Sequence, residues 1–248
     1  MRSRLHLRHS ALLLEYGDDR LMIDCGGDWL RHVNSISPSA IVLTHAHPDH
    51  AHGLRKGVSC PVYATAQTWD LIERYPIADR HRIRIGRSLR VGAIALEAFA
   101  VEHSVRAPAV GFRLTVGKAS LFYVPDVVFI RNRRRALNGI ELYIGDGARL
   151  DRPLLRRRDH HSIGHAPIRE QLDWCREASI PRAVFTHCGS EIVRADLRLV
   201  NAHVRRLGRE RGVVAGIASD GMKLRLRVGT SGRRLDAPQC RRQGDLMF

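Results

Sequence analysis

The first forty residues alternate between apolar and polar positions in the manner of β-strands. Residues 11–16 and 21–24 are apolar-rich runs on either side of Gly17-Asp18-Asp19, and this pattern predicts a β-hairpin. The run 41–44 is short and apolar, as buried strands are, and it leads directly into a segment rich in histidine. We therefore expect a sheet in this part of the chain, with the histidines in a loop at the end of a buried strand.

Strand-like runs continue through the middle of the chain, and apolar residues at helical spacing become frequent in its last third. Helices are predicted over residues 65–75, 168–178 and 196–209. Further strands are predicted over residues 61–64, 82–85, 88–91, 94–101, 110–116, 121–124, 142–144, 183–186, 213–218 and 224–228. Nothing before residue 229 suggests a domain boundary, so we expect one α/β domain over residues 1–228. Residues 229–248 are polar and basic without periodicity, which predicts a disordered tail.

The composition is that of an ordinary globular protein. The 248 residues are 44% hydrophobic and 27% charged, which excludes a mainly disordered or collagen-like chain. No apolar stretch is long enough for a membrane span, and the N-terminus lacks an apolar signal core, so we expect a soluble, unprocessed chain. Five cysteines without a C-x-x-C pair indicate neither a disulfide framework nor a thiolate zinc site, and favour the reducing cytoplasm.

The charge is the unusual part of the composition. The chain has 41 basic and 25 acidic residues, which gives a net charge of +16, and all but three of the basic residues are arginine. A field of this sign favours anionic ligands such as phosphate compounds or nucleic acid. The preference for arginine over lysine also fits codon bias in a GC-rich genome, so functional anion binding and codon bias both remain open.

The densest group of polar residues follows the predicted strand 41–44 directly, in the order Thr44-His45-Ala46-His47-Pro48-Asp49-His50. A loop that leaves a strand can aim alternate side chains at one point, and imidazole nitrogens with a carboxylate oxygen bind Zn²⁺ at about 2.0–2.2 Å. A single buried histidine is usually a packing residue. Three histidines and an aspartate within six positions indicate a metal site instead.

This segment resembles the H-x-H-x-D-H motif of the metallo-β-lactamase superfamily, position for position. The superfamily has three later ligands, and residues of the right type follow strand-like runs in the required order. The resemblance implies an αββα four-layer sandwich of two mixed β-sheets flanked by helices, with two divalent metal ions, for which Zn²⁺, Mn²⁺ and iron are all compatible. It also implies that one ion is held by His45, His47 and His103, that the other is held by Asp49, His50 and His187, and that Asp126 bridges them.

The resemblance implies further roles around the metals. Asp24 matches an early aspartate that orients a metal-binding loop through hydrogen bonds, although a turn-forming role before Gly26 is the alternative. Asp49, Asp126 and His165 are the implied catalytic residues. His165 matches a histidine that approaches the scissile phosphate, and a capping or surface role is the alternative. Neighbouring His160 and His161 are further candidates for that position, and for Asp146 we expect a structural or supporting role.

The sequence context of His103 resembles the tRNase Z and phosphoribosyl cyclic phosphodiesterase branch. It reads Glu102-His103-Ser104, whereas many thioester hydrolases of the superfamily have Gly-His-Thr-Pro-Gly there. The chain departs from that branch in lacking an opening Gly-Thr-Gly segment and a cysteine cluster. Only 23 positions separate His103 from Asp126, too few for a tRNA-gripping arm. The resemblance therefore implies a small or cyclic phosphodiester as substrate.

Two arginine runs lie close in sequence to these candidate residues. The first includes Arg131 and Arg133, and the second begins at Arg156. If the runs rim the site, these three arginines are candidates for binding the substrate through forked hydrogen bonds to phosphate. A solvated face is the alternative.

Taken together, the residues and the resemblance predict a cytoplasmic, dinuclear metal-dependent hydrolase that cleaves an anionic phosphodiester with a metal-bridging hydroxide. Two alternatives stay open. One is a carboxylic ester, lactone or thioester hydrolase of the same fold. The other is a nuclease or a non-catalytic nucleic-acid-binding protein, which the positive charge favours. The resemblance also implies a possible homodimer, and no membrane partner is expected.

Overall fold

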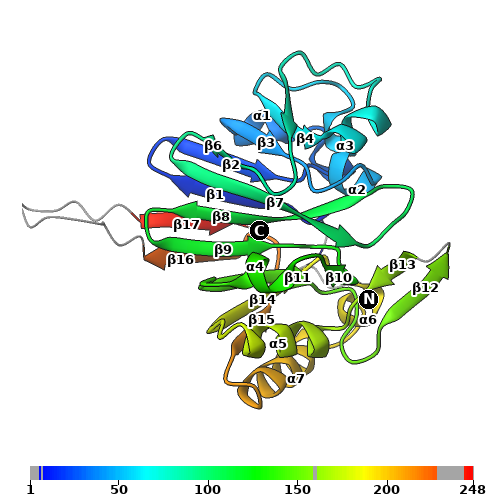
Figure 1. The fold of residues 1–248 in the computed structure, drawn as a ribbon, viewed down its shortest axis with the longest axis vertical. Helices are drawn as coiled ribbons and strands as arrows, with labels where there is room; N and C mark the ends of the chain where they lie inside the picture. The colour runs from blue at the N-terminus through cyan, green and yellow to red at the C-terminus, as the bar shows by residue number, and fades with distance from the viewer. Residues whose placement is uncertain (1–5, 7, 159–160, 228–242, 248) are drawn as a thin grey trace, which may run out of the picture.

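The strands form two large mixed sheets and a separate two-stranded hairpin in the computed structural model, which describes residues 6, 8–158, 161–227 and 243–247 (Figure 1). In the first sheet the strand order is β16-β17-β1-β2-β3-β4-β5. Neighbours from β2 to β5 are parallel, and the other pairs are antiparallel. The strands are β1 (Leu12–Tyr16), β2 (Asp19–Ile23), β3 (Ala40–Val42), β4 (Val62–Thr65), β5 (Arg80–Ile83), β16 (Lys223–Arg227) and β17 (Gln243–Met247).

In the second sheet the strand order is β10-β7-β8-β9-β11-β14-β15, and β6 pairs with β7. The pairs from β9 to β15 are parallel, and the rest are antiparallel. The strands are β6 (Ser88–Val91), β7 (Ile94–Glu102), β8 (Ala109–Val116), β9 (Ala119–Tyr123), β10 (Phe129–Ile130), β11 (Leu142–Asp146), β14 (Arg182–Thr186) and β15 (Val214–Ile217). The hairpin consists of β12 (Leu154–Arg158) and β13 (His161–His165).

The two sheets pack face to face, and helices cover their outer faces (Figure 1). The α-helices are α1 (Val33–Ile36), α2 (Pro48–Ala51), α3 (Ala66–Leu71), α4 (Arg133–Leu137), α5 (Ile168–Glu177), α6 (Ser190–Val193) and α7 (Leu197–Arg209), with short 3₁₀ turns at Gly27–Trp29 and His52–Leu54. Alternation along β1 shows the layering, because Leu12 and Leu14 belong to the core between the sheets and Leu13 to the core on the outer face. This is the expected αββα sandwich.

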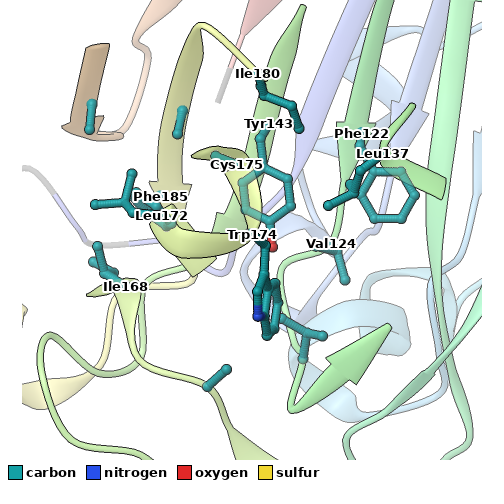
Figure 2. Close-up of a cluster of buried hydrophobic side chains, with 14 of the residues drawn as sticks. Phe122, Val124, Leu137, Tyr143, Ile168, Leu172, Trp174, Cys175, Ile180 and Phe185 are labelled. Atoms are coloured by element: carbon teal, nitrogen blue, oxygen red, sulfur yellow. The ribbon is translucent and has the colours of Figure 1, made fainter. Parts of the chain in front are cut away.

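A third core lies between the second sheet and its helices (Figure 2). Tyr143 and Phe185 come from the sheet, and Leu172 and Trp174 come from α5. The apolar face of α5 is the one that the spacing of residues 168–178 predicts.

Leu172→Ala is expected to lower the free energy of unfolding by about 2–5 kcal/mol, because Leu172 is fully buried and its loss leaves a cavity. Leu199→Ala on α7 is the matched control. Leu199 is 71% exposed, so its loss should change stability by less than about 0.5 kcal/mol. Urea denaturation followed by circular dichroism measures both, and equal losses would contradict this packing.

The structure differs from the predicted elements in several places, and four short elements, α1, α2, α6 and β10, had also not been predicted. Helix α3 ends at Leu71 instead of continuing to residue 75, because the backbone leaves helical geometry at Ile72. The hairpin β12–β13 and the short helix α4 had no periodic signal in the sequence. Part of the predicted tail is also ordered. Most of residues 229–248 lie outside the described residues, but Gln243–Met247 form β17 between β1 and β16, where strand pairing satisfies the backbone groups of β1.

Across the described part of the chain, no helix has the length and apolar character needed to cross a membrane.

Candidate metal centre

Two neighbouring strands of the first sheet carry the first group of candidate residues. Asp24 follows β2, and the segment from Thr44 to His50 follows β3. Because β2 and β3 are parallel, their carboxyl ends lie at the same edge of the sheet. Pro48 is the first residue of α2, where its fixed backbone angle suits a helix start, and Asp49 and His50 lie in the same short helix.

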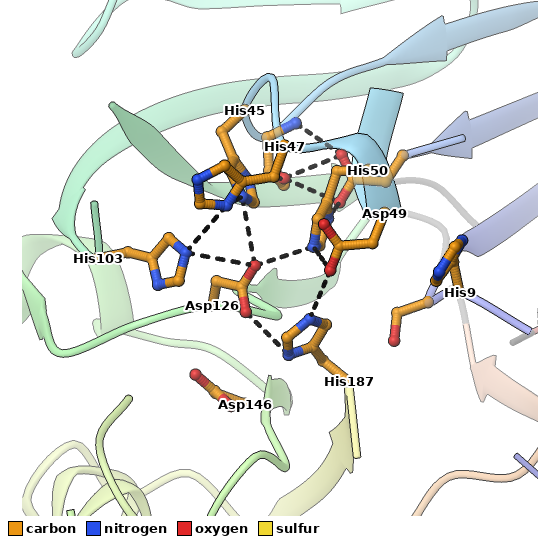
Figure 3. Close-up of polar contacts among 12 residues, drawn as sticks. His9, His45, His47, Asp49, His50, His103, Asp126, Asp146 and His187 are labelled. Atoms are coloured by element: carbon orange, nitrogen blue, oxygen red, sulfur yellow. Dashed lines mark hydrogen bonds and ion pairs between the residues drawn. The ribbon is translucent and has the colours of Figure 1, made fainter. Parts of the chain in front are cut away.

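The second sheet carries the remaining candidates at its facing edge (Figure 3). Strands β7, β9, β11 and β14 all run in the same direction. His103, Asp126 and His187 follow β7, β9 and β14, and Asp146 ends β11. The two sheets therefore bring all seven residues of the expected ligand set into one cluster, although they come from positions 45 to 187.

The first half of this cluster is formed by His45, His47 and His103. Their ligand atoms lie within 4.8 Å of one another. His47 Nδ1 is 2.9 Å from His45 Nε2 and 3.4 Å from His103 Nε2. Three nitrogens this close can hold one cation.

The second half is formed by Asp49, His50 and His187, and Asp126 lies between the halves. Asp49 Oδ2 is 3.2 Å from His187 Nε2 and 3.6 Å from His50 Nε2. Asp126 Oδ2 is 2.9 Å from His50 Nε2 and 3.4 Å from His45 Nε2, while its Oδ1 is 2.8 Å from His187 Nδ1. The Asp126 carboxylate thus touches residues of both halves.

Several of these atoms are buried without a hydrogen bond. His50 Nε2, Asp126 Oδ1 and His187 Nδ1 have no hydrogen-bond partner among the described residues, despite their short distances to one another. Buried polar atoms are normally paired, and unpaired ones call for an ion or another ligand. Nitrogen and carboxylate donors aimed at shared points fit divalent metal ions.

The electrostatics of the cluster also suit a cation. Burial would raise the pKa of Asp126, but His187 and His50 more than offset this and hold the pKa well below its usual range. Burial lowers the pKa of His45, which favours the neutral imidazole that binds metals. Burial would also lower the pKa of His50, but Asp126 and Asp24 raise it to about 10. This raised pKa keeps a proton on His50, and a metal ion would take the place of that proton beside the carboxylates.

Asp24 fixes the orientation of the histidine loop. Its carboxylate accepts hydrogen bonds from the Thr44 backbone N–H at 2.8 Å, from the Thr44 hydroxyl at 2.8 and 2.9 Å, and from His50 Nδ1 at 2.9 Å. The Thr44 hydroxyl lies 3.0 Å from His45 Nδ1. With their Nδ1 atoms held in this way, the imidazoles of His45 and His50 turn their Nε2 atoms to the cluster. Asp24 and His187 both have positive φ angles, 64° and 52°, which are uncommon for residues other than glycine.

Asp24→Asn is expected to weaken metal affinity by about 10- to 100-fold, because the amide cannot accept all of these hydrogen bonds. Asp28→Asn is the control, since Asp28 is exposed and contacts His9 instead. Competition with a chromophoric chelator measures both affinities. Equal affinities for the two variants would show that Asp24 does not support the metal-binding loop.

His165 lies beside the cluster and is held by Asp146. His165 Nδ1 is 2.7 Å from Asp146 Oδ2, and its ring centroid is 5.0 Å from that of His103 and 5.6 Å from that of His187. Burial would lower the pKa of His165, but the hydrogen bond and charge of Asp146 raise it. Asp146 is fully buried and also accepts hydrogen bonds from Val127 N and Ala148 N. It therefore supports His165, in keeping with the expected supporting role. His160 lies outside the described residues.

The sequence analysis assigned no role to two supporting residues, Gln171 and Gly164. Buried Gln171 of α5 accepts from the backbone N–H of Asp146 and donates to the backbone carbonyls of Asp146 and Ala166. A glutamine on the apolar face of a predicted helix is the signal that could have revealed it. Gly164 exchanges two hydrogen bonds with His103: its N–H donates to the His103 carbonyl, and its own carbonyl lies 3.0 Å from His103 Nδ1.

Two pockets flank the cluster. The larger, of about 450 Å³, lies beside Asp49 and His187. One of its walls is a segment formed by His6 and residues 8–10, which we call the strap. Two hydrogen bonds hold the strap in place. His6 Nε2 lies 2.7 Å from the Ala218 carbonyl oxygen, and Trp29 Nε1 donates to the His9 carbonyl oxygen at 3.0 Å. The smaller pocket, of about 300 Å³, lies beside His103. A substrate at the cluster therefore has space on both sides.

The three candidate arginines lie in different places. Arg131 lines the smaller pocket and is 3.7 Å from Glu102. Arg156 is exposed on β12. Arg133 lines neither of these two pockets, and its role in substrate binding stays a prediction. Its guanidinium lies 5.0 Å from the Trp174 ring centroid and 3.1 Å from a Glu177 oxygen, so tertiary contacts with α5 hold it there.

Comparison with known families identifies the fold family. The beta-lactamase superfamily domain matches residues 19–188, which contain every residue of the cluster. The chain belongs to this superfamily. As a superfamily member with the complete His and Asp cluster, it is a metal-dependent hydrolase.

Curated relatives in the superfamily include several nucleases. Ribonuclease Z from Methanopyrus kandleri is 25% identical over 266 residues, covering 88% of this chain and 92% of the relative. Exodeoxyribonuclease WalJ from Streptococcus pneumoniae is 24% identical over 141 residues, covering 50% of this chain and 52% of the relative. This chain therefore spans about half the length of WalJ, but nearly all of the ribonuclease.

Solved structures from the superfamily show the same fold. The metallo-β-lactamase fold protein YhfI from Bacillus subtilis has a TM-score of 0.69 at 18% identity, covering 87% of this chain and 90% of YhfI. A diphosphatase from the PhnP family has a TM-score of 0.63 at 17% identity, covering 87% of this chain and 82% of the diphosphatase. Human tRNase Z, short form, has a TM-score of 0.58 at 18% identity, covering 77% and 89%. These likenesses confirm the predicted fold.

Proposed function

We propose that this hydrolase is a phosphodiesterase with two divalent metal ions, Zn²⁺ being the first choice for His and Asp ligands. The observation that supports it is the position of Asp126, whose Oδ2 lies 3.4 Å from His45 Nε2 in one half of the cluster and 2.9 Å from His50 Nε2 in the other. In this proposal His45, His47 and His103 hold one ion, Asp49, His50 and His187 hold the other, and Asp126 is shared. The names of ribonuclease Z and the PhnP-family diphosphatase support a phosphate ester as the group cleaved.

Two ions held there would lower the pKa of water and neutralise charge on a phosphoryl oxygen. The residues of the chain fix where this happens. Asp24 and Thr44 set the directions of His45 and His50, and Asp49, Asp126 and His187 close the opposite side. The two pockets accept the groups on either side of the phosphate.

His165 is the candidate proton donor. Its Nδ1 is held by Asp146, so its Nε2, which has no partner among the described residues, is free to donate to a phosphoryl or leaving oxygen. The raised pKa keeps the ring protonated over a wider pH range. General acid catalysis of this kind contributes about 10²- to 10⁴-fold.

The test is hydrolysis of bis-p-nitrophenyl phosphate by chelated protein to which Zn²⁺ or Mn²⁺ is returned, with p-nitrophenyl acetate as the competing ester. We expect metal-restored turnover of the phosphodiester, a loss of that turnover in Asp126→Ala, and a fall of about 10²-fold or more in His165→Gln with metal content unchanged. His81→Gln is the matched control, because His81 is exposed and pairs with Asp79. Turnover of the acetate alone, or no metal-dependent turnover with metal bound, would overturn the proposal.

A cytoplasmic location is part of the proposal. Cys25, Cys60, Cys175 and Cys188 are free thiols in the structure, as expected in a reducing compartment.

A further inference from the structure

The hairpin β12–β13 projects from the body of the molecule (Figure 1). Its strands pair with each other and with no other described strand. Leu154 is 46% exposed and Leu155 is 51% exposed. Since successive residues of a strand point to opposite faces, both faces of the hairpin are open to solvent at this point.

The same strand and the residues just before it carry uncompensated positive charge. Arg156 on β12 and Arg152, two residues before the strand begins, are exposed, and among the described residues neither guanidinium has an acidic partner. Arg133 and Arg135, by contrast, are paired with Glu177 and Glu97. We define the hairpin surface as Arg152, Leu154 and Arg156. It offers cations beside an exposed apolar side chain.

The base of the hairpin is anchored to the metal centre. Gly164 of β13 exchanges hydrogen bonds with His103, and the Ala166 N–H donates to the Val127 carbonyl at 2.6 Å, next to Asp126. An isolated two-stranded hairpin is marginal on its own, so these bonds are what hold it in place. A ligand on the hairpin surface is therefore held in a fixed position relative to the cluster.

The strand register places Arg156 on the same face of the hairpin as His165. Leu154 is directly opposite His165, and alternation along β12 places Arg156 on the same face as Leu154. Arg156 lies two positions, about 7 Å, further along the strand. A chain that has one phosphate at the cluster beside His165 can place the next groups along this face.

We propose that the hairpin surface docks the strand of a single-stranded polynucleotide whose scissile phosphodiester lies at the metal cluster. This inference rests on the proposed function, and it replaces the expected small or cyclic substrate with a polynucleotide. A nucleic-acid strand presents phosphates to the arginines and base faces to Leu154, a combination that neither a simple anion nor an apolar surface offers. A second copy of this chain is disfavoured as occupant, because each copy has a net charge of +16.

The experiment compares two substrates in the metal-loaded enzyme: bis-p-nitrophenyl phosphate and an unstructured, fluorescently labelled oligonucleotide of about twelve nucleotides, as RNA and as DNA. In Arg152→Gln/Arg156→Gln, kcat/KM for the oligonucleotide should fall by about tenfold or more, and the salt dependence of its KM should become shallower by about 0.7 in log–log slope for each arginine. In Leu154→Ser, the oligonucleotide KM should rise, because Leu154 lies on the same face of the hairpin as Arg156. Both variants should hydrolyse bis-p-nitrophenyl phosphate as the parent does, which also shows that they are folded.

The matched control is Arg198→Gln/Arg205→Gln, two exposed arginines on α7, and it should leave both substrates unaffected. The proposal is overturned if the hairpin variants lose both activities equally, if they lose neither, if the control behaves like them, or if the parent cleaves bis-p-nitrophenyl phosphate but no oligonucleotide. A change from dimer to monomer in the hairpin variants on size exclusion would assign the surface to a second copy and overturn it as well. A parent enzyme without any metal-dependent phosphodiesterase activity is a different result, because it removes the proposed function itself.

Discussion

Asp126→Asn is expected to lower kcat/KM for a phosphodiester by more than about 10³-fold and to reduce the bound metal below two equivalents. Asp126 is almost completely buried. Its Oδ2 faces His45 of one half and His50 of the other, and its Oδ1 faces His187. Asparagine has nearly the same size, but it is neutral and has only one oxygen. The variant therefore keeps the packing and loses the shared ligand.

Steady-state kinetics with bis-p-nitrophenyl phosphate and elemental analysis of the bound metal together measure this effect. Asp70→Asn, on the exposed face of α3, is the control and should match the parent in both respects. If Asp126→Asn retained two equivalents of metal and most of its activity, the bridging role would be wrong, even though the other six residues lie close together.

Gly164→Ala should have the second largest effect, a loss of about 100-fold in activity together with a destabilisation of more than about 1 kcal/mol. The φ angle of Gly164 is +133°, and a Cβ atom at this position would overlap the carbonyl oxygen of Leu154. The backbone must therefore move. That movement breaks the two hydrogen bonds to His103 and displaces His165, the next residue.

Gly212→Ala separates the backbone penalty from the effect on the metal centre. Gly212 has a φ of +70°, and a Cβ atom added there would meet nothing within 4 Å. The variant should show a similar loss of stability of about 1 kcal/mol, but no loss of activity in the folded protein. Urea denaturation and activity assays compare the two variants. Equal activity in both would mean that Gly164 does not position His103.

The positions of the metal-centre residues could be predicted because local signals fix them. Each candidate follows an apolar run. In the structure, runs such as 41–44 and 183–186 form parallel strands or lie at the ends of such strands. Parallel strands bring their carboxyl ends together, so polar residues that directly follow such strands in the sequence are expected to lie close together in the fold. This is why the histidine segment and His187 could be placed near one another from the sequence.

The hairpin could not be predicted, because no local pattern specifies it. Leu154-Leu155 is followed by three arginines, which gives no alternation. The hydrogen bond that anchors the hairpin joins His103 and Gly164, which are 61 positions apart. Arg133 shows the same limit. In the sequence its run of arginines resembles a solvated or ligand-binding face, and the contact between Arg133 and the Trp174 ring can be seen only in the folded structure.

The strap has a practical consequence for producing the protein. One wall of the larger pocket is made of residues 6 and 8–10, so a tag fused directly ahead of residue 1 would start within a few residues of the wall that faces Asp49 and His187. A polyhistidine tag at that end would bring further imidazoles, which themselves bind metal ions, close to the metal centre. Metal stoichiometry and inhibition measured on such a fusion would include the tag's own binding. The affinity handle therefore belongs at the other terminus, or should be cleaved off before metal is counted.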